Sequence, residues 1–392
     1  GSIERPLTFN NNDRPGIILA GSVSKYINGY GVNLGKEIVI FTNNDSAYQT
    51  ALDCHHQNKK VAAIVDIRNE IDGDLPLKVK NLGIKIYSGS IISDTFGRKK
   101  IKGVTIKKIN ENNEISKNNI EVLNCDLLCM SGGWSPTVHL FTQSRGKLKF
   151  RNEDSCFVPD EALQKTISVG SCNGVFDLKS ILTETYKSVN YFLYKNKKEN
   201  LEIEVYDSEK IKVGKQKNAW LINDKDKIGK SKMFVDFQND VTAKDIKIAL
   251  SEGFQSIEHL KRYTTNGMAT DQGKTSNINA LGIISELTGQ DISHLGTTTF
   301  RLPYTPVTFG AIAGRYVKEF FDIERTTPMH EWHVNNNALF EDVGQWKRAW
   351  YYPKNNETMD EAVNREVKAT RDSLGILDAS TLGKIDLKGR DV

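Results

Sequence analysis

The sequence predicts an α/β protein whose main sheet is parallel, and three consecutive stretches carry that prediction. Ile38 to Phe41 is a continuous β-branched and aromatic run, typical of a strand buried on both faces of a parallel sheet. A helix is expected from about Ala47 to Gln57. A second strand follows at Val61 to Val65 and ends on Asp66. Strand, helix and strand in this order form the βαβ unit of nucleotide-binding folds.

Composition bounds the class of protein. The 392 residues suffice for two or three domains, and 38% hydrophobic with 26% charged residues is typical of a soluble globular protein. The longest apolar runs fall short of a membrane span, and the net charge of +4 arises from mixed charges. We therefore expect neither a membrane nor a nucleic acid as a partner. An odd set of cysteines favours reduced thiols in a cytoplasm: Cys54, Cys125, Cys129, Cys156 and Cys172.

Both ends of the chain look cut. Gly1-Ser2 resembles a cloning remnant, and no secretory signal follows it. The last residues, from Leu382 onward, suggest the start of a strand pair. We therefore expect an internal piece of a longer protein.

The turn between the first strand and its helix reads "TNNDS", where a dinucleotide site would place glycines. These side chains fill the space through which a pyrophosphate approaches, and Asp45 adds a negative charge that competes with phosphate at the helix N-terminus. The same residue, or Ser46, could cap the helix without any ligand. Two interpretations remain open, an NAD site and an idle dinucleotide-type fold. The candidates for NAD contact are Thr42, Asn43, Asn44, Asp45, Ser46 and, at the ribose, Asp66.

Two later turns are rich in glycine. An apolar strand, Leu127 to Met130, precedes Ser131-Gly132-Gly133, and another short strand is expected before Gly170 to Gly174 and a long amphipathic helix. This order resembles the two-dinucleotide-domain flavoprotein oxidoreductases. The resemblance implies further NAD contacts at Gly132, Gly133, Gly170 and Asn173, and a first glycine-rich fingerprint upstream. Any tight strand-to-helix connection could use the same glycines.

The dinucleotide-type region is expected at 1–195, and a polar, Lys-rich connector at 196–230. Within the connector, Leu201, Ile203 and Val205 alternate as in an edge strand. A small helical domain is expected at 231–295. Thr242 and Asp245 form a capping-box pattern, Gly253 is a natural stop, a second helix begins at Ser256, and a third runs from Ser276 to about Leu287 before Gly289.

The helical domain resembles the small [2Fe-2S]-binding domain of bacterioferritin-associated ferredoxin and of amine-oxidising flavoenzymes. Its four cysteine positions are held here by Asp236, Gln238, Asp271 and Ser276. Iron–sulfur clusters need thiolate ligands, so we expect no cluster and no other metal. The turn from Gly273 to Ser276, at the head of a helix, suits a phosphate. Alternatively, Ser276 only caps the helix and Lys274 is solvated.

Several long motifs resemble the α subunit of heterotetrameric sarcosine oxidase, in order and over nearly the whole chain. They include "VIFTNNDSAY", "VDFQNDVTAKDIKIALSEGFQSIEHLKRYTTNGMATDQGKTSN", "GTTTFRLPYTPVTFGAIAG" and "VNREVKATRDSLGILDASTLGKIDLKG". The family implies an NAD-binding domain, a cluster-free ferredoxin-like domain and a folate-binding aminomethyltransferase-like domain. The last would begin within 296–392, and its tetrahydrofolate site would follow Val392.

The resemblance also implies an activity and partners. A β subunit would carry FAD and oxidise sarcosine, with further γ and δ subunits, and an FMN would lie between α and β. Sarcosine, oxygen and water would give glycine, formaldehyde and hydrogen peroxide, and tetrahydrofolate would instead yield methylenetetrahydrofolate. Such an oxidoreductase subunit would not be active alone. The candidates for FMN contact are Thr270, Asp271, Lys274, Thr275, Ser276, Thr298, Thr299 and Arg301.

Two other interpretations remain open. One is a non-catalytic scaffold, and the other is the α-type subunit of a related proline or dimethylglycine dehydrogenase. No catalytic residue is assigned. His330 and His333 in "HEWH" lack the zincin spacing, and Cys54 and His55 are adjacent on a helix, so they point to different faces.

Overall fold

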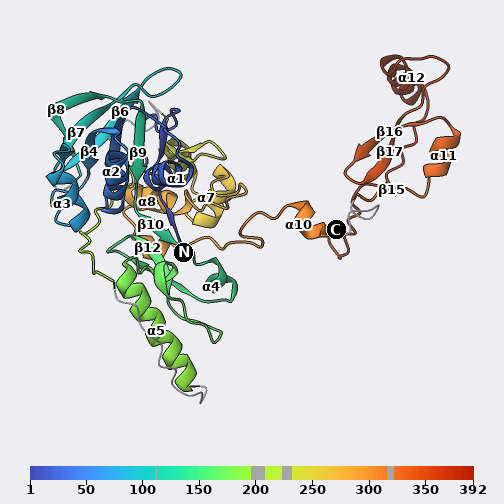
Figure 1. Ribbon diagram of the computed structural model, residues 1–392. Coiled ribbons are helices and arrows are strands. Elements are labelled where there is room, and N and C mark those ends of the chain that lie inside the picture. The colour runs from blue at the N-terminus through green and yellow to red at the C-terminus, as the bar shows by residue number, and fades with distance from the viewer. Residues whose placement is uncertain (111–112, 196–207, 223–231, 316–321) are drawn as a thin grey trace. The chain divides into compact units, whose positions relative to one another are not determined.

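The computed structural model describes residues 1–110, 113–195, 208–222, 232–315 and 322–392. The chain divides into two compact units, Gly1–Pro306 and Val307–Val392, and each is described by itself (Figure 1). The predicted alternation of Leu201, Ile203 and Val205 lies outside the described residues.

A five-stranded parallel sheet forms the centre of the first unit, with the order β2-β9-β3-β4-β5. The strands are β2 (Ile17–Leu19), β3 (Glu37–Thr42), β4 (Lys60–Asp66), β5 (Ile86–Tyr87) and β9 (Leu127–Ser131). The predicted strands β3, β4 and β9 and the helix α2 (Ser46–His56) are confirmed. Because β4 lies on one side of β3 and β9 on the other, the strand order reverses at β3 while all five strands stay parallel, as in doubly wound folds.

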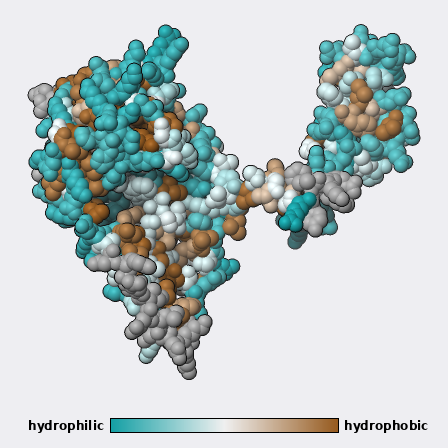
Figure 2. Space-filling view, viewed as in Figure 1, coloured by the Kyte–Doolittle hydropathy of each residue, from teal (hydrophilic) through white to brown (hydrophobic). Residues whose placement is uncertain are grey.

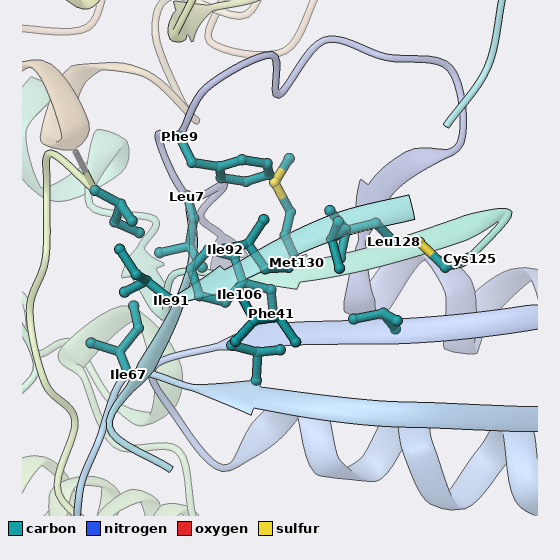
Figure 3. Close-up of a cluster of buried hydrophobic side chains, with 14 of the residues drawn as sticks. Leu7, Phe9, Phe41, Ile67, Ile91, Ile92, Ile106, Cys125, Leu128 and Met130 are labelled. Atoms are coloured by element: carbon teal, nitrogen blue, oxygen red, sulfur yellow. The ribbon is translucent and has the colours of Figure 1, made fainter. Parts of the chain in front are cut away.

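Both faces of this sheet are buried. Alternate residues of β3 separate the two cores, with Ile38 and Ile40 on one face and Val39 and Phe41 on the other. The helices α1 (Ala20–Tyr30), α2 and α3 (Asp74–Asn81) cover the first face. An antiparallel meander covers the second face, formed by β6 (Ser90–Phe96), β7 (Gly103–Ile109) and β8 (Ile115–Asn124). Figure 3 shows side chains from the meander meeting those of the sheet and of the N-terminal segment.

Shorter elements complete the dinucleotide-type part. Strand β1 (Ser2–Glu4) pairs with β10 (Trp134–Pro136), and β11 (Leu148–Arg151) pairs with β12 (Cys156–Pro159). They are accompanied by α4 (His139–Gln143), the 3-10 turn η1 (Gly170–Asn173) and α5 (Leu178–Lys195). The predicted strand before Gly170 is wrong, because the described residues just before η1 pair with no strand.

The helical part packs around its own core. It comprises β13 (Phe234–Asp236), β14 (Val241–Thr242), α6 (Ala243–Ser251), α7 (Ile257–Thr264), α8 (Asn277–Thr288) and α9 (Ile292–Leu295). The capping box of Thr242 and Asp245 is confirmed, and α8 ends at Gly289 in the left-handed conformation, as predicted.

The second unit holds a three-stranded sheet with the order β15-β17-β16. Its elements are α10 (Phe309–Ala313), β15 (Arg325–Thr326), α11 (His330–Asn335), β16 (Leu339–Val343), β17 (Trp346–Tyr351) and α12 (Met359–Asp372). His333 of the "HEWH" segment is buried between Tyr352 and Asp378, with ring nitrogens 2.6 Å and 3.0 Å from their oxygens. The predicted strand pair from Leu382 onward is wrong, since these described residues form no strand.

Apolar residues also reach the surface. Figure 2 shows them gathered around α5, where Leu178 and Phe192 are more than half exposed. None of the helices in the described ranges is long and apolar enough to cross a membrane.

The contact between α8 and the described part of the connector generates a stability prediction. A Cβ on Gly282 would lie 2.0 Å from the Trp220 ring, whereas a Cβ on Gly29 of α1 would meet nothing within 4 Å. We expect Gly29→Ala to raise the free energy of unfolding by roughly 0.5–1 kcal/mol, since alanine favours helix. Gly282→Ala should lower it by about 1–2 kcal/mol, because overpacking outweighs the same gain. Urea unfolding of both variants tests this, and equal effects would contradict it.

Candidate functional site

The β3–α2 turn is closed by its own side chains. The Asn44 amide donates to Ser131 Oγ at 3.1 Å and accepts from the Ser46 N–H and hydroxyl at 3.0 and 2.6 Å. Thr42 Oγ1 donates to the Asn44 carbonyl at 2.9 Å. The Asn43 amide reaches the Gly132 carbonyl at 3.4 Å. These contacts hold the turn without a ligand.

Behind this turn lies a buried group of charges. Arg68 Nη1 is 2.6 Å from Asp45 Oδ1, and its Nη2 is 2.7 Å from Asp66 Oδ2. The Tyr48 hydroxyl donates to the same Asp66 oxygen at 2.8 Å. Each of the three charged side chains is at most 3% exposed. Burial, reinforced by the Asp66 charge, raises the pKa of Tyr48 well above its usual value, so the phenol stays a donor. The carboxylate expected to bind a ribose is therefore bound within the protein.

The double glycine after β9 makes room for the segment that follows β1. A Cβ on Gly132 would lie 2.7 Å from the Pro6 carbonyl, and one on Gly133 would lie 2.4 Å from Arg5 Nη2. The fully buried Arg5 donates to the carbonyls of Gly132 at 3.1 Å and Asp154 at 3.0 Å. Burial lowers the pKa of Arg5 to about 10, which leaves it protonated at neutral pH. Close contact with Pro6 and Arg5 therefore accounts for glycine at both positions, without any ligand.

The turn η1 also holds a carboxylate of the chain. The Gly170 N–H donates to Glu184 Oε2 at 2.9 Å, and the Asn173 amide donates to Oε1 at 2.6 Å. Glu184 comes from α5, so helix and turn fix each other. The donors of the NAD candidates Gly170 and Asn173 are therefore already bonded within the chain.

Polar side chains fill the place that the ferredoxin resemblance assigns to a cluster. Asp236 accepts from the N–H groups of Gln238 at 2.9 Å, Asn239 at 3.1 Å and Gly267 at 2.7 Å. The Asn277 side chain lies so close that a Cβ on Gly267 would be 2.3 Å from its Oδ1. The described residues include no group of three His, Cys, Asp or Glu side chains that could hold a metal ion.

The N-terminus of α8 differs from the other two turns. Its N-cap Ser276 is 1% exposed, and the buried Oγ has no hydrogen-bond partner in the structure. The first turn of α8 contains no acidic residue and no side-chain cap. Lys274 lies beside it, with Nζ donating to the Tyr304 carbonyl at 2.8 Å and 4.1 Å from the Tyr304 ring centre. A free hydroxyl, a cation and a helix N-terminus suit an anion.

The "TTTFR" segment, Thr297 to Arg301, contacts the turn before α8, so the two groups of predicted FMN residues lie near each other. Gln272 accepts from the Arg301 N–H and donates to the Arg301 carbonyl, both at 2.8 Å. Thr298 is buried and accepts from the Asn277 amide at 3.0 Å. Of the other candidates, Thr299 and Arg301 have exposed side chains, and Thr275 lines a pocket together with Phe237. The Thr270 hydroxyl donates to the Gln238 side chain at 3.4 Å. Asp271 accepts from the Gly273 N–H at 3.1 Å.

Sequence reasoning missed His139, Ser135 and Tyr304, which lie near this helix N-terminus. The His139 ring stacks on Tyr304 at 3.7 Å, and Ser135 lines a pocket together with Lys274 and Phe300. Burial and then the charge of Lys274 lower the pKa of His139. No motif signals these residues, because their proximity arises only from the packing of α4 against the segment after α9.

Sequence reasoning also missed Glu4. This carboxyl group is 6% exposed, and it accepts from the Gly21 N–H at 2.8 Å in the first turn of α1. Burial raises its pKa to about 7.

The fold is of the Rossmann type found in dinucleotide-dependent oxidoreductases. The structure of L-proline dehydrogenase from P. horikoshii shares it with a TM-score of 0.55, at 19% identity over 80% of this chain and 57% of that one. Residues 230–315 match the sarcosine oxidase A3 domain, and residues 329–392 match the GCVT N-terminal domain.

The whole of this chain is similar in sequence to part of two curated relatives. The chain is 41% identical to the sarcosine oxidase subunit alpha of Corynebacterium sp. strain P-1 and 40% identical to that of strain U-96. The alignments cover 100% and 99% of this chain and 40% of each relative. The chain is thus a homologue of sarcosine oxidase α subunits and spans about two-fifths of their length, which confirms the predicted resemblance.

Glu4 generates a pH prediction. Its pKa in the folded protein is about 7, against 4.5 for the ordinary group, so the folded state holds this proton where the unfolded state has lost it. Stability from this group is therefore lost as pH rises from about 4.5 to about 7, between the pKa values of the unfolded and the folded state. Over this pH range, we expect the free energy of unfolding to fall by roughly 2–3 kcal/mol less in Glu4→Gln than in the wild type.

Urea unfolding across this pH range measures the effect. Glu70→Gln is the matched control, since Glu70 is exposed and should leave the wild-type slope unchanged. Equal slopes for the wild type and Glu4→Gln would contradict the assignment.

Proposed function

We propose that this chain is part of the α-type subunit of an amine-oxidising flavoenzyme that acts on sarcosine. The similarity to two sarcosine oxidase α subunits at 41% and 40% identity, over essentially the whole chain, is the observation that carries the proposal. The partner subunits would be of the β, γ and δ types, with FAD on β. The amine pocket would lie on β, so this chain alone should not oxidise sarcosine.

The N-terminus of α8 fits an FMN phosphate. The orphan Ser276 hydroxyl and the adjacent Lys274 offer a donor and a charge, and no acidic side chain of the first turn opposes an anion. Thr275 would add a second hydroxyl, and Thr298, Thr299 and Arg301 would lie alongside, because Gln272 ties their segment to the turn. When bound, FMN would supply electron transfer between the FAD of the β subunit and oxygen.

The C-terminal unit supports the folate part of the proposal. Residues 329–392 match the beginning of the GCVT N-terminal domain. In the full-length subunit this domain would take the one-carbon product to tetrahydrofolate, or release it as formaldehyde alongside glycine and hydrogen peroxide.

A scaffold role is the second candidate. The closed β3–α2 turn and the polar side chains in the cluster position favour it, because Asn44, Asp66 and Asp236 are bonded within the chain. A proline or dimethylglycine dehydrogenase relative remains compatible with the shared fold, since amine specificity would lie on another subunit. Flavin content separates the first two roles, and turnover with sarcosine, proline and dimethylglycine separates the substrates.

The FMN site is tested with the complex formed by co-expressing this chain and a β-type subunit. We expect Lys274→Met and Ser276→Ala each to weaken FMN retention about tenfold, because each removes a contact to a charged phosphate. The flavin released on denaturation is quantified as FMN and FAD after dialysis.

Lys247→Met is the matched control, since Lys247 is exposed on α6 of the same helical part. It should leave FMN content unchanged. FMN retained equally in all variants would contradict this site, and a complex that holds no FMN at all would favour the scaffold.

A further inference from the structure

A segment of the connector, residues 212–217, lies across the carboxyl ends of β3 and β4. We call it the strap. The Gly214 N–H donates to Asp45 Oδ2 at 2.7 Å, and the Lys217 N–H donates to the Asn43 carbonyl at 3.4 Å. Arg68 Nη1 donates to the Lys215 carbonyl at 3.4 Å. The strap thus contacts the turn and the ion-pair group at the place where β3 meets its neighbours.

The strap is anchored at its start and just beyond its end. Lys212 and Asp74 exchange two hydrogen bonds, Lys212 N–H to Asp74 Oδ2 at 2.7 Å and Asp74 N–H to the Lys212 carbonyl at 3.0 Å. Lys212 Nζ also pairs with Asp72 at 2.7 Å, although both side chains are more than half exposed. Past the strap, the Ile222 N–H donates to the Thr8 carbonyl at 3.2 Å.

The strap is also closely packed against the residues around it. A Cβ on Gly73 would lie 1.9 Å from Asp45 Oδ2, and one on Gly133 would lie 2.7 Å from Gln216 Oε1. A Cβ on Gly214 would lie 3.2 Å from Arg68 Nη1. The strap, the start of α3 and the double glycine therefore meet without room for a further group between them.

Ligands of doubly wound sheets bind outside the carboxyl ends of the strands, at the point where strand order reverses. Here that point lies between β3 and β9, and chain atoms fill it. Two carboxylates, Asp45 and Asp66, face a single guanidinium, so the group carries a net negative charge that opposes a pyrophosphate at the N-terminus of α2. The side chains of Asn44, Asp45 and Asp66 are bound to the strap or to neighbouring groups of the chain.

We propose that the strap is an internal ligand that occupies the nucleotide crevice, so that this sheet binds no dinucleotide. The residues Thr42 to Ser46 and Asp66 then serve the fold and the strap. Any NAD bound by a full-length subunit is held elsewhere. This inference is independent of the FMN site, because the strap and the N-terminus of α8 are formed by different residues.

Hydrogen exchange on the whole chain, read by mass spectrometry, tests the proposal. The probes are NAD, NADP and ADP at millimolar concentrations. We expect none of them to change exchange in peptides that cover residues 42–46 or 212–217. Nucleotide-dependent protection of either peptide would overturn the proposal, and this arm requires no variant.

The second arm compares two variants without nucleotide. Gly214→Pro removes the N–H that binds Asp45 and should speed exchange several-fold in residues 42–46 as well as in the strap. Gly383→Pro is the control, because a Cβ on this exposed glycine of the second unit would meet nothing within 4 Å. It should change neither peptide. Unchanged exchange of residues 42–46 in a folded Gly214→Pro chain would show that the strap does not hold the crevice. The FMN proposal is tested by the flavin content of the complex, and the strap is tested by hydrogen exchange. A complex without FMN would therefore not change the conclusion about the strap.

Discussion

The requirement that buried backbone N–H groups find an acceptor governs the places in this chain where a ligand would be expected. Among the described residues, carboxylates of the chain are the acceptors at several such places: Asp45 receives the Gly214 N–H, Glu184 receives that of Gly170, and Asp236 receives three N–H groups at the position that the ferredoxin resemblance assigns to a cluster. Each carboxylate sits where a phosphate or a cluster would bind in a related fold, and each stabilises the turn in its place. Arg68 then offsets the buried charge of Asp45, which couples β3, β4 and the strap.

The N-terminus of α8 is the contrasting case. The first turn of α8 contains no acidic residue, and the buried Ser276 hydroxyl has no hydrogen-bond partner. The Lys274 ammonium lies over the Tyr304 ring beside this turn. The helical part therefore combines a turn closed by Asp236 with a place that suits an anion. Gln272, in the turn before α8, binds both backbone groups of Arg301, so this turn and the segment from Thr298 to Arg301 are held together.

The sequence predicted the parallel sheet, the capping box and the α8 boundaries, because hydrophobic periodicity, caps and glycine stops are local signals. It failed at the strand before Gly170 and at the strand pair from Leu382, since a strand exists only where another strand pairs with it. At the site, the motif around Lys274 was found from residue type and resemblance. Arg68, Gly214 and Glu184 were not, because their roles depend on contacts between segments far apart in the chain, which no local pattern encodes.

We propose that an anion binds at the N-terminus of α8 and not at the carboxyl ends of the parallel sheet. Amide chemical shifts of the isotope-labelled chain, followed by NMR during titration with inorganic phosphate, test it most directly. The account predicts saturable shifts at the amides of Lys274 to Asn277 and none at those of Asn43 to Tyr48. Shifts at the β3–α2 turn, with α8 unchanged, would contradict it.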